Sequence, residues 1–150
     1  MTPAVEAAKR AGIAFALHEY TGVELGDGEY GVGVAEALGR PPGQLFKTLV
    51  ATTDERLAVF VVPADRRLDL RRIGKRSALA GPSEAERATG YVVGGISPLG
   101  QRRLLPTTVD ESALEWETIL VSAGRRGLQI ELAPGDLVSL TGARVAAISA

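Results

Sequence analysis

Short apolar runs with strand character outnumber the helical segments of this chain, and this balance limits its fold more than any other feature. Seven such runs occur, at residues 13–20, 45–51, 57–62, 104–109, 118–122, 128–132 and 144–148. The run Leu57–Val62 is apolar throughout, rich in β-branched residues and closed by Pro63, which is typical of a short buried strand. Glycines at residues 124 and 127 predict a hairpin turn between two of the runs.

Short helices are expected between these strands. Thr2 and Pro3 predict a helix over residues 3–11 that ends at Gly12. Others are expected at residues 32–38, 69–73 and 136–140, and Ser83 has capping-box spacing for a helix that ends at Thr89. Since strands and helices do not alternate strictly, we expect an α+β fold: a mixed, barrel-like sheet of about seven strands surrounded by short helices.

Length and composition narrow the functional classes. The 150 residues suit one domain over residues 1–150. The chain has no 18-residue apolar stretch and no secretory signal pattern, so we expect a cytoplasmic protein that does not bind membranes. With no cysteine and one histidine, it lacks a thiol nucleophile, disulfides and zinc sites of the thiolate or multi-histidine kind. We expect neither a metal nor a cofactor.

Charge argues against indiscriminate binding to nucleic acids, because the net charge is −1. The basic residues are nevertheless bunched in pairs, at positions 66–67, 71–72, 75–76, 102–103 and 125–126. Such pairs are either solvated surface or local contacts for phosphate, and the sequence leaves both interpretations open.

Within residues 89–101, a loop rich in glycine follows directly on an apolar, strand-like run. Gly94, Gly95, Gly100 and Pro98 crowd this loop, and glycine lets a ligand approach the main chain closely. The loop therefore suits an oxyanion or the end of a nucleotide. The alternative is a tight connection between two strands.

Lys47 stands inside the apolar run 45–50, on the strand face of Leu45 and Leu49. A lysine in such a run costs free energy, and the chain has only three lysines against 14 arginines. Lys47 is therefore a candidate for contact with an anion or a carbonyl. An edge-strand lysine that discourages aggregation is the equally weighted alternative.

Other side chains are weaker candidates. Asp136 has the position of a helix cap, and its alternative role is to orient Lys47 or to bind a substrate amine. His18 and Tyr20 share one strand face and could line a pocket. Ser122 precedes Gly124 without a Gly-x-Ser-x-Gly elbow, so it makes a poor nucleophile candidate.

In this order the motifs resemble the YbaK family of free-standing aminoacyl-tRNA editing proteins, relatives of the insertion domain of bacterial prolyl-tRNA synthetase. The resemblance runs nearly end to end. It is carried by residues 1–5, 46–49, 68–70, 89–101, 105–107, 121–132 and 135–137.

The resemblance implies a mixed β-barrel core and removal of an amino acid wrongly esterified to tRNA, with cysteine on tRNA for proline as the leading substrate and prolyl-tRNA synthetase as a candidate partner. Lys47 and Gly100 would be catalytic. The expected substrate-binding residues are Tyr20, Tyr30, Gly94, Gly95, Ser97, Pro98, Ser122 and Asp136. No protein nucleophile is needed, because an aminoacyl ester is already activated and backbone donors can stabilise the oxyanion. The family also suggests that the thiol of a cysteine substrate attacks its own ester.

Residues 21–29 depart from the cysteine-specific pattern, so alanine, serine or another small amino acid stays open as substrate. A non-catalytic module that binds tRNA ends or a synthetase is the alternative function. A general nucleotide-binding domain is the third.

Overall fold

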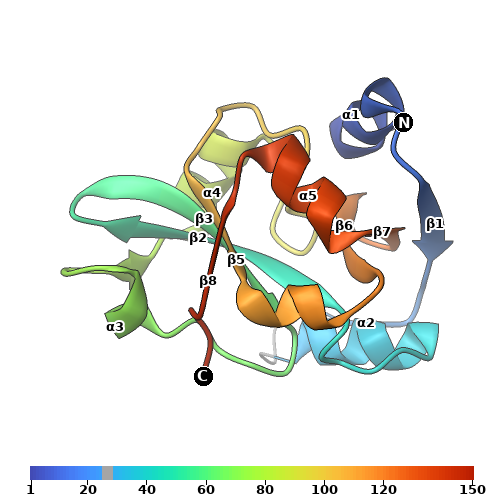
Figure 1. The fold of residues 1–150 in the computed structure, drawn as a ribbon, viewed down its shortest axis with the longest axis horizontal. Helices are drawn as coiled ribbons and strands as arrows, with labels where there is room; N and C mark the ends of the chain where they lie inside the picture. Colours follow the sequence, from blue (N-terminus) through green and yellow to red (C-terminus); the bar gives the residue numbers. More distant parts are fainter. Residues whose placement is uncertain (25–28) are drawn as a thin grey trace.

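The computed structural model describes residues 1–24 and 29–150 (Figure 1). In chain order its elements are α1 (Pro3–Ala11), β1 (Phe15–Glu19), α2 (Tyr30–Leu38), β2 (Phe46–Thr53), β3 (Arg56–Pro63), α3 (Leu70–Ile73), β4 (Ala78–Leu79), α4 (Pro82–Thr89), β5 (Thr107–Asp110), the 3-10 helix η1 (Glu111–Glu115), β6 (Ile119–Arg125), β7 (Leu128–Leu132), α5 (Pro134–Thr141) and β8 (Arg144–Ala146). In Figure 1 the β2–β3 hairpin crosses the centre, with α4 and α5 above it and α2 and α3 below.

The strands form two sheets, and the predicted α+β class with mixed pairing is confirmed. One sheet has the order β1-β7-β6 and is antiparallel throughout. The other has the order β4-β2-β3-β5-β8, in which β3, β5 and β8 run parallel and the remaining pairs antiparallel. The largest apolar cluster lies where the sheets and helices meet and includes Phe46, Val59, Ile119, Ile130 and Leu137.

The barrel-like arrangement is not closed, because within the described residues the two sheets meet through one isolated bridge, between Leu45 and Leu120. The physical reason lies in β2. That strand uses one side for β3 and the far end of its other side for β4, so only the residues ahead of it are free to meet β6.

One edge of β2 is left partly unpaired. The carbonyl of Gln44 accepts a hydrogen bond from the Leu120 amide (3.1 Å), and the carbonyl of Val50 accepts one from the Ala80 amide (2.9 Å). Main-chain groups alternate in direction along a strand, so the N–H and C=O of Thr48 face this same side. No strand of the described chain pairs with Thr48 there, which leaves its main-chain groups open at a sheet edge.

Several local predictions need correction. The predicted capping box at Ser83 is absent, since α4 begins at Pro82 after Gly81. The Glu86 carboxylate instead accepts a hydrogen bond from the Val93 amide. No strand precedes the glycine-rich loop, because residues 90–93 follow directly from α4.

Two further strands of the structure, β5 and β4, differ from what the sequence predicts. β5 begins at Thr107, not Leu104, because Pro106 has no N–H for a ladder and Leu104 is 92% exposed. The two-residue strand β4 was not predicted, since two residues show no alternation.

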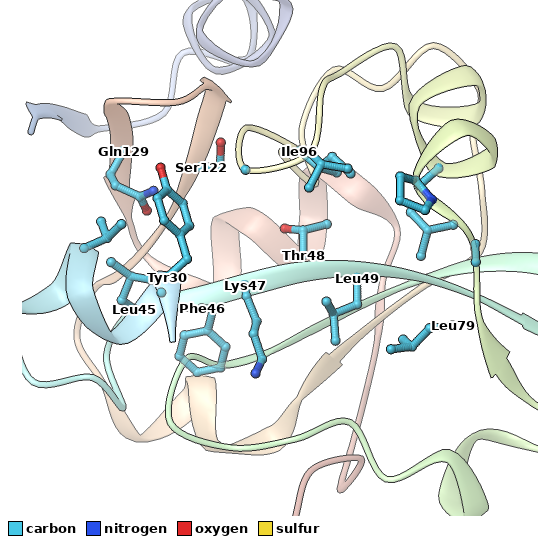
Figure 2. A pocket seen from close by; sticks show the side chains of 18 residues that line it. Tyr30, Leu45, Phe46, Lys47, Thr48, Leu49, Leu79, Ile96, Ser122 and Gln129 are labelled. Atoms are coloured by element: carbon cyan, nitrogen blue, oxygen red, sulfur yellow. The ribbon is translucent and has the colours of Figure 1, made fainter. Parts of the chain in front are cut away.

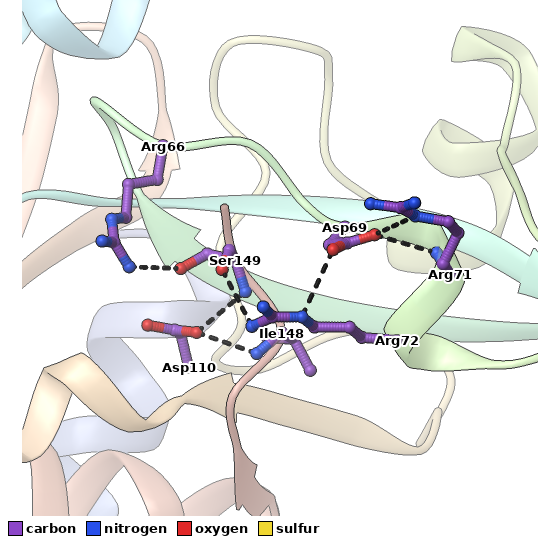
Figure 3. A network of polar contacts seen from close by, with 7 residues as sticks. All are labelled: Arg66, Asp69, Arg71, Arg72, Asp110, Ile148 and Ser149. Atoms are coloured by element: carbon purple, nitrogen blue, oxygen red, sulfur yellow. Dashed lines mark hydrogen bonds and ion pairs between the residues drawn. The ribbon is translucent and has the colours of Figure 1, made fainter.

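Asp110 fastens the end of the chain to β5 (Figure 3). Its carboxylate accepts hydrogen bonds from the main-chain amides of Ile148 (3.0 Å) and Ser149 (3.1 Å) and from Ser112. Burial alone would raise the pKa of Asp110, but these hydrogen bonds outweigh it and lower the pKa.

In the described part of the chain, no helix is long and apolar enough to cross a bilayer.

Candidate active site

A cleft of about 430 Å³ opens at the unpaired edge of β2 (Figure 2). Its volume falls in the range of small-molecule sites. β2 forms its floor, α2 closes one end, and the β4–α4 segment with the glycine-rich loop closes the other. The lining residues are Tyr30, Gly31, Val34, Leu45, Phe46, Lys47, Thr48, Leu49, Val50, Leu79, Ala80, Pro82, Ala85, Val93, Gly94, Ile96, Ser122 and Gln129.

The lining is mostly apolar, with a few polar side chains set into it. Those are Tyr30, Lys47, Thr48, Ser122 and Gln129. The described lining contains no carboxylate and no imidazole. A reaction in this cleft therefore depends on one ammonium, hydroxyls, an amide and main-chain groups.

Lys47 is the cation of the cleft. It is partly buried, and no hydrogen bond or ion pair joins its ammonium to the described residues. Burial lowers the pKa of Lys47, the nearby Arg67 cation lowers it further, and Asp65 partly offsets both. Figure 2 shows Lys47 and Thr48 leaving β2 on opposite sides, so the cleft wraps around the edge of the strand.

The glycine-rich loop is held firmly beside the cleft. The Val93 amide donates to Glu86 (2.9 Å), and Arg126 Nε donates to the Val93 carbonyl (2.9 Å). Tyr91 Oη donates across the base of the loop to the Leu99 carbonyl (2.6 Å). A fixed loop can present its main chain to a ligand without first becoming ordered.

Close packing explains why glycine occupies position 95. A Cβ atom added to Gly95 would lie 2.8 Å from Cα of Arg125 and 2.9 Å from the Arg126 nitrogen. The loop therefore packs directly on the main chain of the β6–β7 hairpin. The neighbouring Gly94 has a φ of 88° and lines the cleft.

Tyr20 and Tyr30 form a pair at the α2 end. Their hydroxyl oxygens are 2.6 Å apart, and their ring centroids are 6.4 Å apart. Burial and the hydrogen bond with Tyr20 raise the pKa of Tyr30. The Tyr30 hydroxyl therefore stays neutral at physiological pH, and Tyr20 acts on the cleft by holding Tyr30.

Three polar groups point into the cleft from different strands. Ser122 and Gln129 are cross-strand partners on β6 and β7, and Thr48 lies on β2. Ser122 Oγ accepts from the Gly124 amide (3.2 Å). The oxygens Thr48 Oγ1 and Gln129 Oε1 are buried and have no hydrogen-bond partner among the described residues.

The structure gathers only part of the predicted site. Lys47, Tyr30, Gly94 and Ser122 line the cleft. Pro98 and Gly100 line a second, smaller cavity of about 240 Å³, between the loop, α1 and α5. Gly100 packs so closely on the α1 start that an added Cβ would lie 2.6 Å from the Pro3 carbonyl oxygen.

The other predicted residues lie elsewhere. Ser97 is fully buried, and its hydroxyl accepts from the Leu99 amide (3.2 Å). Asp136 is in the first turn of α5, whose N-cap is Ala133, and it does not line the cleft. His18 is bound to Glu131, with 2.8 Å between Nε2 and Oε1. The roles of these residues stay predictions.

Several arginines already have partners within the protein. Arg66 and Arg72 donate to Ser149, and Arg71 and Arg72 lie against Asp69 (Figure 3). Of the arginine pairs, Arg67 is close enough to the cleft to influence Lys47, and Arg126 is close enough to influence Tyr30. Among the arginine pairs, Arg67 and Arg126 are therefore the candidates for contact with a phosphate at the cleft.

Sequence reasoning missed Thr48 and Gln129. Gln129 does leave a signal, because it alternates with Leu128 and Ile130 and so marks a polar second face of its strand. That its oxygen is buried without a partner is not visible in the sequence.

Among residues 1–24 and 29–150, no group of three His, Cys, Asp or Glu side chains could hold a metal ion.

Comparison with known protein families identifies the family to which this chain belongs. The family model for the aminoacyl-tRNA editing domain matches residues 32–140, which include β2, the glycine-rich loop and the β6–β7 hairpin. The chain belongs to the aminoacyl-tRNA editing domain family. The YbaK-like resemblance of the sequence is thereby confirmed.

Individual proteins similar to this chain support the family assignment. A protein of Enterococcus faecalis, provisionally named Cys-tRNA(Pro)/Cys-tRNA(Cys) deacylase EbsC, is 41% identical over 122 residues, covering 77% of this chain and 74% of its own. A crystal structure provisionally described as a trans-editing enzyme for prolyl-tRNA synthetase has a TM-score of 0.83 at 27% identity, covering 100% of this chain and 99% of its own. The hypothetical protein APE2540 has a TM-score of 0.86 at 27% identity, covering 99% of both chains.

Residues 25–28, within the segment 21–29 that departs from the cysteine-specific pattern, lie outside the described residues.

Proposed function

We propose that this editing domain is an aminoacyl-tRNA deacylase that acts in trans and removes a small, wrongly attached amino acid, cysteine first of all, from tRNA for proline. The observation that carries the proposal is the cleft at the β2 edge, whose apolar lining includes the open strand edge at Thr48 and Lys47, an ammonium with no hydrogen bond or ion pair to the described residues. Family membership and the 41% identical relative support the reaction and the substrate.

The cleft can accelerate hydrolysis without supplying a nucleophile. Water adds to the ester carbonyl, the bond to the ribose oxygen breaks, and that oxygen takes up a proton as the amino acid leaves. The Thr48 amide, open at the sheet edge, can donate to the developing oxyanion. The glycine-rich loop, held by Glu86 and Arg126, would receive the terminal adenosine.

Lys47 serves as an electrostatic anchor in this proposal. Its ammonium has no protein partner among the described residues, so it is free to meet a phosphate or the polarised ester. Burial strengthens such a contact, because a lower local dielectric screens it less. With a cysteine substrate, the thiol can attack the ester carbonyl in place of water, with the same donors stabilising the oxyanion. The S–C bond then forms as the bond to the ribose oxygen breaks, the ribose oxygen takes up the proton lost by the thiol, and the amino acid leaves as a cyclic thioester.

Selection of the tRNA needs more surface than this cleft offers. We propose that prolyl-tRNA synthetase supplies it, so that adding the synthetase raises the rate on tRNA for proline. The reaction belongs in the cytoplasm, where ribosomes consume aminoacyl-tRNA.

Single-turnover deacylation of Cys-tRNA(Pro) by wild type, Lys47→Met and Lys75→Met tests the proposal. Lys75 is exposed and outside the cleft, so its variant is a matched control for loss of a lysine. We expect a loss of about 100-fold or more in Lys47→Met and no change in Lys75→Met. Equal rates in all three proteins would refute the role of the cleft. Binding of tRNA ends without turnover by wild type would favour a non-catalytic module.

A further inference from the structure

Two buried oxygens in the cleft lack the hydrogen bonds that buried polar groups normally have. Gln129 is 4% exposed, and its Oε1 has no hydrogen-bond partner in the described part of the chain. Thr48 is partly buried as a residue, and its buried Oγ1 atom likewise has no partner among the described residues. Most buried polar atoms in folded proteins are hydrogen-bonded, and an unpaired one costs free energy. Two such oxygens in one cleft indicate that a ligand completes them.

The surroundings define what kind of ligand group fits. Ser122, opposite Gln129 in the β6–β7 register, has its oxygen occupied by the Gly124 amide, so its own hydrogen is left to donate. Gln129 Oε1 can only accept, and Thr48 Oγ1 can do both. Around them the lining is apolar, with Val34, Leu45 and Ile96 among its residues. The matching group is small and donates at least one hydrogen.

We propose that Gln129 is a specificity-determining residue of this site, which accepts a hydrogen bond from the amino-acid part of the substrate. The proposal rests on the deacylase function proposed above. Two groups of a cysteinyl ester have this chemistry, the α-amine and the side-chain thiol. Because no carboxylate lines the cleft in the described residues, a neutral acceptor such as Gln129 must serve either group.

The position of Gln129 makes it a stable reader of the substrate. Its strand β7 is paired on both sides, with β1 and β6, and the adjacent Leu128 and Ile130 lie in the main core. Two residues further, Glu131 ties β7 to Arg40 through a pair of hydrogen bonds of 3.0 and 2.9 Å. The paired strand fixes the main chain of Gln129, and burial of its side chain leaves the amide little room to turn away from the cleft.

Four stable amide analogues of the aminoacyl-adenosine end separate the two donors. They carry cysteinyl (amine and thiol), alanyl (amine), 3-mercaptopropionyl (thiol) or propionyl (neither) groups. Each is titrated into wild type, Gln129→Met and Gln129→Glu. Methionine keeps the length of the side chain without the acceptor, whereas glutamate keeps an acceptor.

For the donor that Gln129 reads, we expect Gln129→Met to weaken binding about tenfold to 100-fold, with propionyl binding unchanged and Gln129→Glu close to wild type. Loss confined to amine-bearing analogues identifies the α-amine, and loss confined to thiol-bearing ones identifies the side chain. Equal weakening of all four analogues, no weakening of any, loss in both variants, or no binding to wild type would overturn the inference.

Turnover of Cys-tRNA(Pro) by wild type in the same series separates this inference from the proposed function. If wild type turns over and Gln129→Met shows no selective loss, the inference fails alone. If wild type does not turn over, the proposed function fails, and the inference that depends on it fails as well.

Discussion

Glu131 offers the sharpest quantitative test of what holds the site together. Its carboxylate receives two hydrogen bonds from Arg40 (3.0 and 2.9 Å), one from Thr118, and a contact of 2.8 Å with His18. These partners tie β7 to β1 and to the segments that follow α2 and precede β6. The Arg40 hydrogen bonds, followed by those of Thr118 and His18, lower the pKa of Glu131 from 4.5 to about 2 despite its burial.

The perturbation is Glu131→Gln, which keeps the shape and removes the charge. A lowered pKa in the folded state means that the ionised carboxylate stabilises the fold, by about 3 kcal/mol for a change from 4.5 to about 2. The side chain is 16% exposed, so solvent screening removes only part of this. We expect the free energy of unfolding at pH 7 to fall by about 2–3 kcal/mol and Tm by about 5–10 °C.

The sign of the pH dependence follows from the same shift. The stabilisation is fully present above the unfolded pKa of about 4.5 and is lost as the pH falls through the folded pKa of about 2. Thermal unfolding of wild type and Glu131→Gln between pH 7 and pH 2.5 should therefore show converging Tm values. Glu115→Gln, at an exposed position of η1, is the matched control and should not differ from wild type. A pH-independent difference, or none at pH 7, would refute this reasoning.

Three further predictions concern the cleft. Lys47→Met should raise Tm by about 1–3 °C at pH 7, because burial and Arg67 disfavour the ammonium, and the gain should shrink as rising pH deprotonates Lys47 in wild type; a lower Tm at pH 7 would count against it. Gly95→Ala should cost about 1–3 kcal/mol of unfolding free energy in urea titrations and slow deacylation, since the new Cβ meets the hairpin main chain; unchanged stability would show that the loop yields. Tyr30→Phe should cost about 1–2 kcal/mol by leaving the Tyr20 hydroxyl without a partner, and no loss on thermal unfolding would contradict this.

Local signals in the sequence predict elements whose boundaries depend on local chemistry. The helix α1 has the predicted bounds, because the Thr2 hydroxyl accepts from the Val5 amide (3.2 Å) and Gly12 ends the helix with a φ of 70°. The capping box predicted at Ser83 is absent because α4 begins earlier, at Pro82 after its N-cap Gly81, and Glu86 binds the Val93 amide. That the barrel-like arrangement stays open could not be predicted, because sequence does not show which edges β2 leaves unpaired.

The candidate site divides in the same way. Lys47 could be predicted, because a lysine within an apolar strand is visible in one dimension. Gln129 and Thr48 could not, since their significance is a missing partner, which depends on three strands distant in sequence. Gly100 shows the reverse limit. Its motif is unbroken, yet Gly100 packs on Pro3 beside the second cavity and does not line the cleft that contains Lys47.

The most direct test of the central claim compares two esters of one tRNA. Single-turnover hydrolysis by wild type is measured on tRNA for proline charged either with cysteine or with proline, with and without prolyl-tRNA synthetase. The account predicts rapid release of cysteine and slow release of proline. Equal rates on both esters, or no hydrolysis of either, would contradict it.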